Sequence, residues 1–231
     1  MNRRDFVTAA AVAACGVAST GVGESAVRQL AGVSRLTPPA NELIRVACAI
    51  SKGTTEIDFI GPQAVFESWH RDPVTRRPSP KFRIFTVAET KDPVDARLPD
   101  YTFADVPAPH VVIVPAQSGS PALLEWLKKV HTTADVTMSV CVGASHLAKA
   151  GLLDGQTATT HHESIDQFEK QYTAVKWIRR VRFVENGRIA TAGGLTSGID
   201  LALHVVDRYF GREAARGVAE HLEYESTRWM V

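Results

Sequence analysis

Apolar runs of strand length alternate with helical patterns from residue 41 onward. Nearly continuous apolar runs occupy 43–50, 110–115 and 136–141, and residues 81–88 form a further strand-like run. Such continuous runs are typical of strands that are buried on both faces of a parallel sheet. The alternation predicts an α/β fold, a flavodoxin-like three-layer sandwich with a central, mostly parallel sheet. Ligands of such sheets bind beyond the carboxyl ends of the strands.

Helices are predicted between and after these strands, where apolar residues recur with helical spacing or a capping residue opens the segment. The first follows a turn at Gly61-Pro62 and carries Val65, Phe66 and Trp69 on one face. The remaining predicted helices cover 121–131, 144–151, 164–171 with Ser164 as N-cap, and two segments within 195–224 that separate at Gly211.

Short strands are predicted in the stretch between residues 157 and 192. Residues 157–161 (TATTH) are predicted as a short strand, and 175–184 alternate in polarity. Glu185-Asn186-Gly187 then predicts a hairpin turn into a strand at 188–192. With no internal repeat or low-complexity tract, residues 40–231 are predicted to form one domain.

The first 39 residues differ in composition from the rest. Arg3 and Arg4 precede an Ala-rich, mildly apolar run, which is the order of a twin-arginine export signal. Residues 1–39 are therefore interpreted as a signal and linker, and we expect the folded domain to work in the periplasm. Cys15 ends a sequence resembling a lipoprotein cleavage box, so a lipid anchor is an alternative. A further alternative is that the N-terminal segment is a helix that is not cleaved and that the protein stays in the cytoplasm.

Composition and charge narrow the choice of partners. The chain has 231 residues and a net charge of +1, so it offers no electrostatic argument for nucleic acid or for a membrane surface. Its three cysteines show no spacing that would hold zinc, and no apolar stretch reaches the roughly 20 residues of a spanning helix. We therefore expect no metal, no cofactor, no nucleic acid and no membrane span, and a small molecule as partner.

Cys141 is the leading candidate for chemistry. It ends an apolar strand and is followed by Val142-Gly143-Ala144, small residues that open a helix. A cysteine at such a strand-to-helix turn has the layout of a nucleophile elbow. Backbone N–H groups at a helix start lower the pKa of a thiol, so this position predicts a reactive thiolate. The alternative is a small core cysteine, of which mid-strand Cys48 is the example.

Two further positions are candidates. Asp58 lies between Ile57 and Phe59, so its carboxylate is either a helix cap or a site residue that exchanges a proton with a thiolate or positions water. His161 and His162 follow a short strand. They would orient a thiol or bind substrate, or else be surface or structural residues without a role in chemistry. The residues alone leave these alternatives open.

Four segments in order resemble the ThiJ/PfpI superfamily of class I glutamine amidotransferase-like proteins. They are 57–62 (IDFIGP), 139–144 (SVCVGA), 150–161 (AGLLDGQTATTH) and 193–203 (GGLTSGIDLAL). The similarity runs from about residue 43 to 224 and is greatest to the isonitrile (isocyanide) hydratase branch and to related domains of some transcription regulators.

The resemblance implies a homodimer in which Cys141 is the nucleophile and Asp58 the neighbouring acid. It implies a hydro-lyase reaction, in which the thiolate attacks an isonitrile carbon, the acid supplies a proton and water releases an N-substituted formamide. Backbone N–H groups of Val142, Ala116 and Gln117 would stabilise the oxyanion. The resemblance also makes His161 and Gly61 candidates for the substrate pocket.

Two positions depart from the hydratase pattern. Val142 replaces a hydroxyl residue that directly follows the cysteine, which removes one polar contact. Ala116-Gln117 replaces a Gly-Gly turn, and neither residue takes a positive φ easily. The alternatives to a hydratase are a glyoxalase- or deglycase-like enzyme and a ligand- or redox-sensing domain without turnover. The regulators carry a DNA-binding region after this domain, and since the chain stops at Val231 we expect no direct DNA binding.

Overall fold

A seven-stranded sheet forms the centre of the computed structural model, which describes residues 35–69 and 81–231. Its strand order is β3-β2-β1-β4-β5-β9-β8, and every neighbouring pair is parallel except the β8–β9 hairpin. The strands are β1 (Ile44–Ala49), β2 (Phe82–Ala88), β3 (Tyr101–Thr102), β4 (Val111–Val114), β5 (Val136–Ser139), β8 (Phe183–Asn186) and β9 (Ile189–Ala192). The predicted mostly parallel α/β sheet is confirmed.

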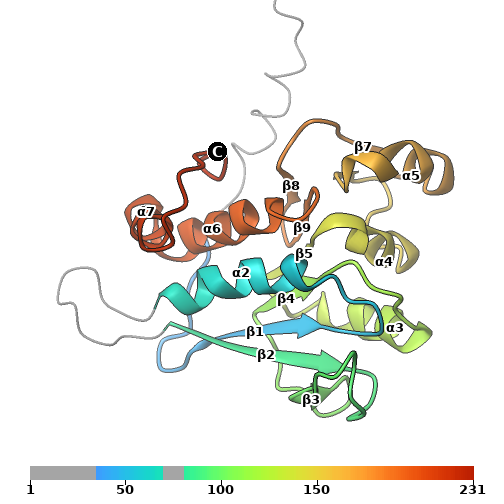
Figure 1. Cartoon of the computed structure of the whole chain (residues 1–231), viewed down its shortest axis with the longest axis horizontal. Coiled ribbons are helices and arrows are strands. Elements are labelled where there is room, and N and C mark those ends of the chain that lie inside the picture. The colour runs from blue at the N-terminus through green and yellow to red at the C-terminus, as the bar shows by residue number, and fades with distance from the viewer. Residues whose placement is uncertain (1–34, 70–80) are drawn as a thin grey trace, which may run out of the picture.

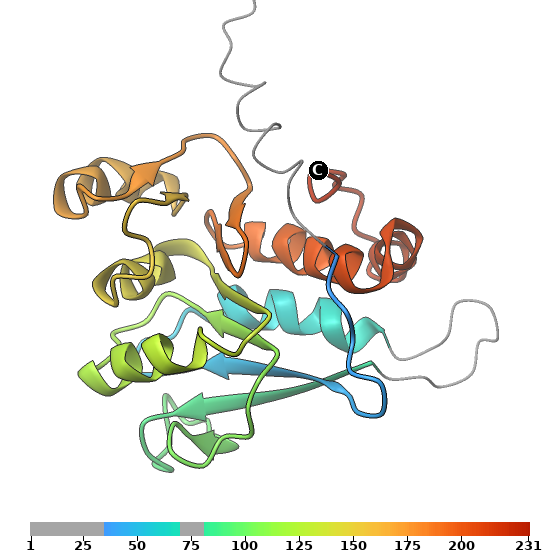
Figure 2. The ribbon, with the colours of Figure 1, turned by 180° about the vertical axis from the view of Figure 1, so that it is seen from behind.

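Helices cover both faces of this sheet (Figures 1 and 2). One apolar cluster joins the sheet to α2 (Glu56–Ser68), α6 (Ser197–Phe210) and α7 (Arg212–His221). A second cluster, on the opposite face, includes side chains of α3 (Pro121–Val130), α4 (Ala144–Lys149) and α5 (Ile165–Gln171). The three-layer arrangement follows from strands whose residues are buried on both sides.

Two expectations about helix starts were wrong. Gly61 and Pro62 lie inside α2, which begins at Glu56, rather than in a turn before it. Pro62 lacks the N–H that would bond the carbonyl of Asp58, and its ring is buried near Gly198 of α6. Ser164 makes no side-chain cap bond, because the short helix η2 (His162–Ser164) leads directly into α5.

The predicted strand over 175–184 is two separate strands. β7 (Lys176–Trp177) pairs in parallel with β6 (Thr157–Ala158) in a small second sheet, whereas β8 begins only at Phe183. Arg180 has a φ of 60°, a left-handed conformation that no continuous strand accommodates. The break lets the chain leave the small sheet and enter the main one.

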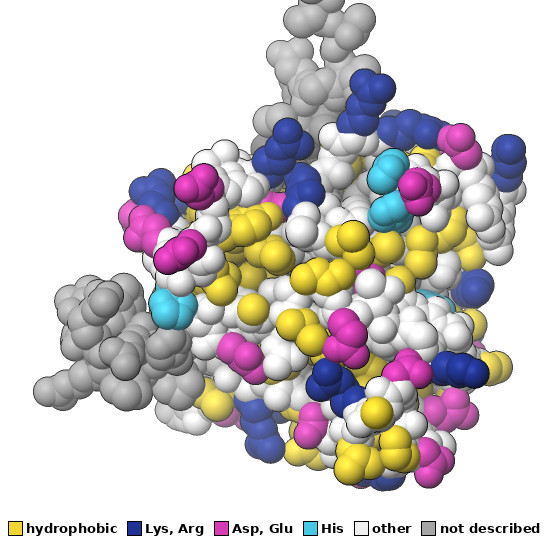
Figure 3. Space-filling model, viewed as in Figure 1, with side chains coloured by type: hydrophobic (Ala, Val, Ile, Leu, Met, Phe, Trp, Pro, Cys, Tyr) yellow, Lys and Arg dark blue, Asp and Glu magenta, His cyan; other side chains and the backbone are white. Residues whose placement is uncertain are grey.

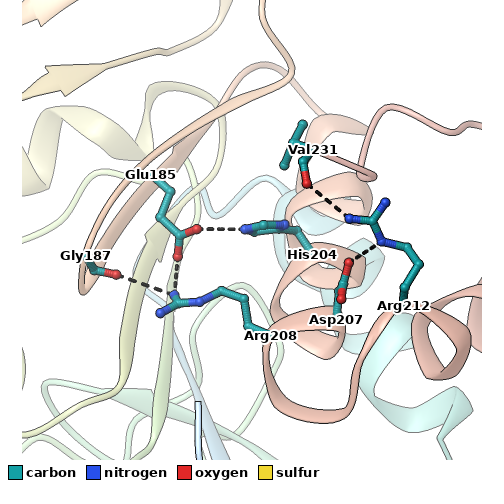
Figure 4. A network of polar contacts seen from close by, with 7 residues as sticks. All are labelled: Glu185, Gly187, His204, Asp207, Arg208, Arg212 and Val231. Carbon is teal, nitrogen blue, oxygen red and sulfur yellow. Dashed lines mark hydrogen bonds and ion pairs between the residues drawn. The ribbon is translucent and has the colours of Figure 1, made fainter. Parts of the chain in front are cut away.

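A buried ion network fixes the β8–β9 hairpin to α6 (Figure 4). Glu185 of β8, 1% exposed, accepts a hydrogen bond from Arg208 and lies 2.7 Å from Nε2 of His204. Arg208 also donates to the carbonyl of Gly187 in the hairpin turn, whose φ of 61° suits the predicted turn. The hairpin end of the sheet therefore depends on side chains of α6.

The N-terminal predictions lie mostly outside the described residues. Arg3, Arg4 and Cys15 belong to residues 1–34, so export, lipidation and location stay predictions. Within the predicted linker, Leu36 donates its N–H to the carbonyl of Arg208 at 2.9 Å and packs against the α2–α6–α7 cluster. Over 35–69 and 81–231, no helix is both long and apolar enough to cross a membrane.

Candidate active site

Cys141 lies where β5 ends, at the first position of the short helix η1 (Cys141–Gly143) that leads into α4. Its φ is 58°, a left-handed conformation that costs a non-glycine residue about 1–2 kcal/mol. Its N–H donates to the carbonyl of Gly193 at the end of β9, and its carbonyl accepts the hydroxyl of Thr160 at 2.9 Å. The strand-to-helix turn predicted from the sequence is present, and hydrogen bonds to Gly193 and from Thr160 hold it on both sides of Cys141.

Gly143 lets this elbow approach β4. A Cβ added at Gly143 would lie 2.2 Å from the carbonyl oxygen of Val114 and 2.8 Å from Pro115. These neighbours are backbone atoms that cannot move aside without displacing the strand. A residue without a side chain is therefore required two positions after the cysteine.

Asp58 lies in the first turn of α2 and is completely buried. Its Oδ2 accepts the N–H of Ala116 at 3.1 Å, and its Oδ1 has no hydrogen-bond partner within residues 35–69 and 81–231. Burial raises the pKa of Asp58 from 3.8 to about 6, and the bond from Ala116 opposes this in part. Asp58 is thus not a cap of its own helix, because its carboxyl group bridges to the end of β4.

The electrostatics of Cys141 differ from the expectation. The residue is 8% exposed, and burial raises the pKa of its thiol, with the negative charge of Asp58 acting in the same direction. Backbone N–H groups of Val142 and Leu195 lower it but do not outweigh burial. The prediction of a lowered pKa was wrong, because the sequence showed the helix start and not the apolar enclosure or the acid beside it.

The backbone donors around the sulfur are only partly those predicted. Val142 faces Sγ as expected, whereas the N–H of Ala116 is taken by Asp58 and is not free for an oxyanion. Neither Ala116 nor Gln117 has a positive φ. Gln117 binds elsewhere: its side-chain amide donates to the carbonyl of Ala49, and its own carbonyl lies 3.1 Å from Nε2 of His146.

Leu195 supplies a donor that sequence reasoning missed. Its N–H faces Sγ of Cys141, and its φ of 51° is left-handed, in the turn that precedes α6. The signal was the dipeptide Gly193-Gly194 before it, which permits a tight turn at the end of β9. The thiol thus lies between N–H groups from two strand-to-helix turns.

The candidate histidines lie near this second turn. A Cβ at Gly194 would be 2.2 Å from Cδ2 of His161, so the imidazole packs directly against the turn that presents Leu195. His161 is half-buried and its Nδ1 is 3.8 Å from a carboxylate oxygen of Glu163, whereas His162 is exposed. His161 therefore borders the site, and His162 faces solvent.

Gly61 serves helix packing. It is buried, and a Cβ there would lie 3.1 Å from Cγ1 of Ile199 and 3.8 Å from Cδ1 of Ile57. Close contact between α2 and α6 accounts for the glycine without a substrate.

Three large apolar side chains are exposed on α2 and in the turn before α6. Ile57, Ile60 and Leu195 are about 40% exposed each, at 39%, 40% and 43%. Side chains of this kind gather over α2 and α6 on the face in Figure 3. In the part of the chain that the structure describes, no three His, Cys, Asp or Glu side chains come together as metal ligands. The described residues thus bring together a thiol, a carboxyl group and backbone N–H groups.

Cys48 shows what a structural cysteine looks like in this fold. It lies mid-strand in β1, is completely buried, and burial raises the pKa of its thiol to about 12. The interpretation of Cys48 as an inert core residue agrees with this environment.

A mostly parallel sheet with a cysteine elbow beside a buried acid defines a class of α/β proteins with a nucleophile at the carboxyl ends of the strands. The chain belongs to the DJ-1/PfpI family, whose family model matches residues 44–208. The sequence resemblance to ThiJ/PfpI proteins is thereby confirmed.

Curated relatives include both enzymes and regulators. The chain is 35% identical over 132 residues to isonitrile hydratase of Pseudomonas putida, a match that covers 54% of this chain and 57% of that one. It is 36% identical over 106 residues to the HTH-type transcriptional regulator CdhR of Pseudomonas aeruginosa, covering 46% and 31%. The matches thus span about a third of the regulator and just over half of the hydratase.

Solved structures agree in fold. A THiJ/PfpI family protein from Pseudomonas syringae has a TM-score of 0.65 and 26% identity, covering 80% of this chain and 76% of that one. Drosophila melanogaster DJ-1beta has the same TM-score at 18% identity, covering 80% and 100%, and supports the fold alone.

Proposed function

We propose that this protein is a cysteine-dependent hydro-lyase that hydrates an isonitrile to an N-substituted formamide. The observation that carries the proposal is the pair of Cys141 and Asp58, a thiol and a buried carboxyl group with one oxygen unpartnered. The 35% identity to an isonitrile hydratase supports this reaction over others of the family.

The pair is suited to share one proton. Burial raises the pKa of both groups, and the charge of Asp58 raises that of Cys141 further, so two negative charges together are disfavoured. When Asp58 holds the proton, its repulsion of the thiolate disappears and the N–H groups of Val142 and Leu195 stabilise the sulfur charge. The form that carries the shared proton on Asp58 therefore pairs a thiolate with a neutral acid, and it is the reactive form in the proposed mechanism.

The reaction then follows in balanced steps. The thiolate of Cys141 forms a bond to the terminal carbon of the isonitrile, and Asp58 gives its proton to that carbon, producing a thioimidate. Water adds to the same carbon, one of its protons goes to Asp58 and the other to the nitrogen, and the added oxygen is left as an oxyanion. The C–S bond breaks, the thiolate is restored, and the product is R–NH–CHO. One water is consumed, and neither oxidant nor reductant takes part.

An apolar setting favours this substrate class. Ile57 precedes Asp58 in α2, Leu195 supplies an N–H that faces the sulfur, and no lysine or arginine is among the groups that shift the pKa of Cys141. A neutral molecule with a small polar head and an apolar substituent fits these side chains better than an anion does. Val142, in place of a hydroxyl residue, extends the apolar character.

The test is turnover of an alkyl isonitrile such as n-butyl isonitrile, with formamide followed by chromatography. Wild-type protein and Cys48→Ala are expected to form the formamide, Cys141→Ala to form none, and Asp58→Asn to be slower by at least about 100-fold. Cys48→Ala is the matched control, because it removes a thiol that lies outside the site. Formamide formation by Cys141→Ala would refute the mechanism.

A sensor is the second candidate, since regulators are among the relatives at 33–36% identity. Parallel incubation with methylglyoxal separates the remaining alternative, a glyoxalase-like enzyme. Lactate formation that requires Cys141 would favour the glyoxalase, and tight binding of the isonitrile without any turnover would favour the sensor. Either result would replace the hydratase proposal.

A further inference from the structure

The hydroxyl group of Thr160 donates a hydrogen bond to the elbow at Cys141. Its side chain is 2% exposed, and its Oγ1 donates to the carbonyl oxygen of Cys141 at 2.9 Å. The bond joins residues that are 19 positions apart, from the segment after β6 to the end of β5. It therefore belongs to the tertiary structure and not to the local turn.

The bonded carbonyl belongs to the same peptide unit as the N–H of Val142. A trans peptide is planar, with its C=O and N–H pointing in opposite directions, so fixing one fixes the other. The N–H of Val142 faces Sγ of Cys141. The hydroxyl of Thr160 thus holds one end of the peptide plane whose other end faces the sulfur, and a bond to the carbonyl also polarises the N–H.

The conformation of Cys141 makes this support necessary. A φ of 58° is disfavoured for a residue with a Cβ, and rotation of the 141–142 peptide would relieve the strain while turning the N–H away from sulfur. The bond from Cys141 N–H to Gly193 fixes only the preceding peptide. Among the described residues, Thr160 donates the side-chain hydrogen bond that fixes the following peptide.

We propose that Thr160 is a positioning residue that aims and polarises the Val142 N–H at the sulfur of Cys141, and so sets the reactivity of this thiol. The role deepens the proposed function, on which its catalytic meaning rests. Its effect on the thiol itself is independent of the substrate.

Thr159 offers a matched control. It is equally buried, at 1%, but its hydroxyl donates to the carbonyl of Ile178 at 2.8 Å, away from the elbow. Replacing either threonine with valine removes one buried hydroxyl and keeps the shape. Only the Thr160 substitution removes the bond to the carbonyl of Cys141.

The experiment measures the rate of alkylation of Cys141 by iodoacetamide as a function of pH in the full chain, with the Cys141 peptide followed by mass spectrometry. Thr160→Val is expected to label about fivefold more slowly at neutral pH, the effect of losing one hydrogen bond, and its pH profile to move to higher pH. Thr160→Ala is expected to do the same, and Thr160→Ser, which keeps the hydroxyl, to resemble wild type. Thr159→Val is expected to keep the wild-type profile, with thermal unfolding measured for every variant.

Several outcomes would overturn the role: an unchanged profile in Thr160→Val and Thr160→Ala, an equal change in Thr159→Val, or an equal change in Thr160→Ser. Isonitrile turnover is measured alongside. A shifted labelling profile in Thr160→Val without any wild-type turnover would leave the positioning role standing and remove the hydratase. Isonitrile turnover by the wild type, together with an unshifted labelling profile in Thr160→Val, would support the hydratase and remove the positioning role.

Discussion

Asp58 accepts the backbone N–H of Ala116 at 3.1 Å, although the two residues are 58 positions apart. The bond joins the first turn of α2 to the end of β4 and leaves Oδ1 of Asp58 without a partner. A carboxyl group that is buried with one oxygen unpartnered is more stable with a proton than without one. The proton on Asp58 therefore affects both stability and chemistry.

The pH dependence of stability follows from this raised pKa. The folded protein binds the proton of Asp58 up to about pH 6, whereas the unfolded chain releases it near 3.8. The folded state thus holds more protons between these values, and the free energy of unfolding falls as pH rises through this window. The loss attributable to Asp58 is about 3 kcal/mol, at about 1.4 kcal/mol for each unit between the two pKa values.

Asp58→Asn isolates this contribution, because asparagine does not titrate. Urea unfolding of both proteins at several pH values from about 4 to 7 gives the difference in their free energies of unfolding. The wild type is expected to lose its advantage over Asp58→Asn as pH rises. A difference that stays constant or grows with pH would mean that Asp58 is ionised in the folded state at low pH.

Selective alkylation distinguishes the two described cysteines. Cys141 is 8% exposed at the site, whereas Cys48 is completely buried, with a thiol pKa raised to about 12. In native protein, iodoacetamide is expected to label Cys141 at least about tenfold faster than Cys48, because both access and thiolate fraction favour it. In urea both are expected to react alike, which is the control. Equal native rates would show that Cys141 is enclosed like a core residue.

Much of the fold could be predicted from the sequence because burial on two faces leaves continuous apolar runs. The runs at 43–50, 110–115 and 136–141 correspond to β1, β4 and β5, and the hairpin turn at 185–187 joins β8 to β9. Strand β3 was missed, since Tyr101 and Thr102 are half-buried edge residues with no apolar run. The merged strand at 175–184 failed because alternation persists through Arg180, whose left-handed φ comes from the tertiary path.

The sequence allowed the candidate reactive residues to be predicted, but not the contacts that surround them. Cys141 and Asp58 were identified from position and from resemblance, and the structure brings them together. The occupation of the Ala116 N–H by Asp58, the donor at Leu195 and the direction of the thiol pKa all depend on contacts between distant segments. No local pattern records such contacts, so these parts required the structure.

Gly143→Ala tests the close approach of the elbow to β4. A Cβ there would lie 2.2 Å from the carbonyl oxygen of Val114, so the substitution is expected to lower the free energy of unfolding by at least about 3 kcal/mol. Gly217→Ala is the control, since Gly217 lies on the exposed face of α7 with nothing within 4 Å. It is expected to raise stability by about 0.5–1 kcal/mol. Urea unfolding of both variants measures these changes. A loss of less than about 1 kcal/mol for Gly143→Ala would contradict the close approach of the elbow to β4.

A double-mutant cycle tests the contact between Gly194 and His161. A Cβ at Gly194 would be 2.2 Å from Cδ2 of the imidazole, a side chain that can rotate away at some loss of packing. Gly194→Ala is therefore expected to cost about 1–2 kcal/mol in the free energy of unfolding, and much less in a His161→Ala background. Equal costs in the two backgrounds would mean that the imidazole does not pack on this turn.

Glu185→Gln tests the buried network between the hairpin and α6. Glu185 is 1% exposed and accepts hydrogen bonds from Arg208 and, at 2.7 Å, from His204 if its Nε2 carries the proton. The substitution removes the carboxylate charge of Glu185 from the buried guanidinium of Arg208, so the free energy of unfolding is expected to fall by about 3 kcal/mol. Glu213→Gln removes an equivalent charge from an exposed pair with Arg216 and is expected to change it by less than about 0.5 kcal/mol. Similar urea midpoints for the two variants would show that the hairpin is held by apolar packing alone.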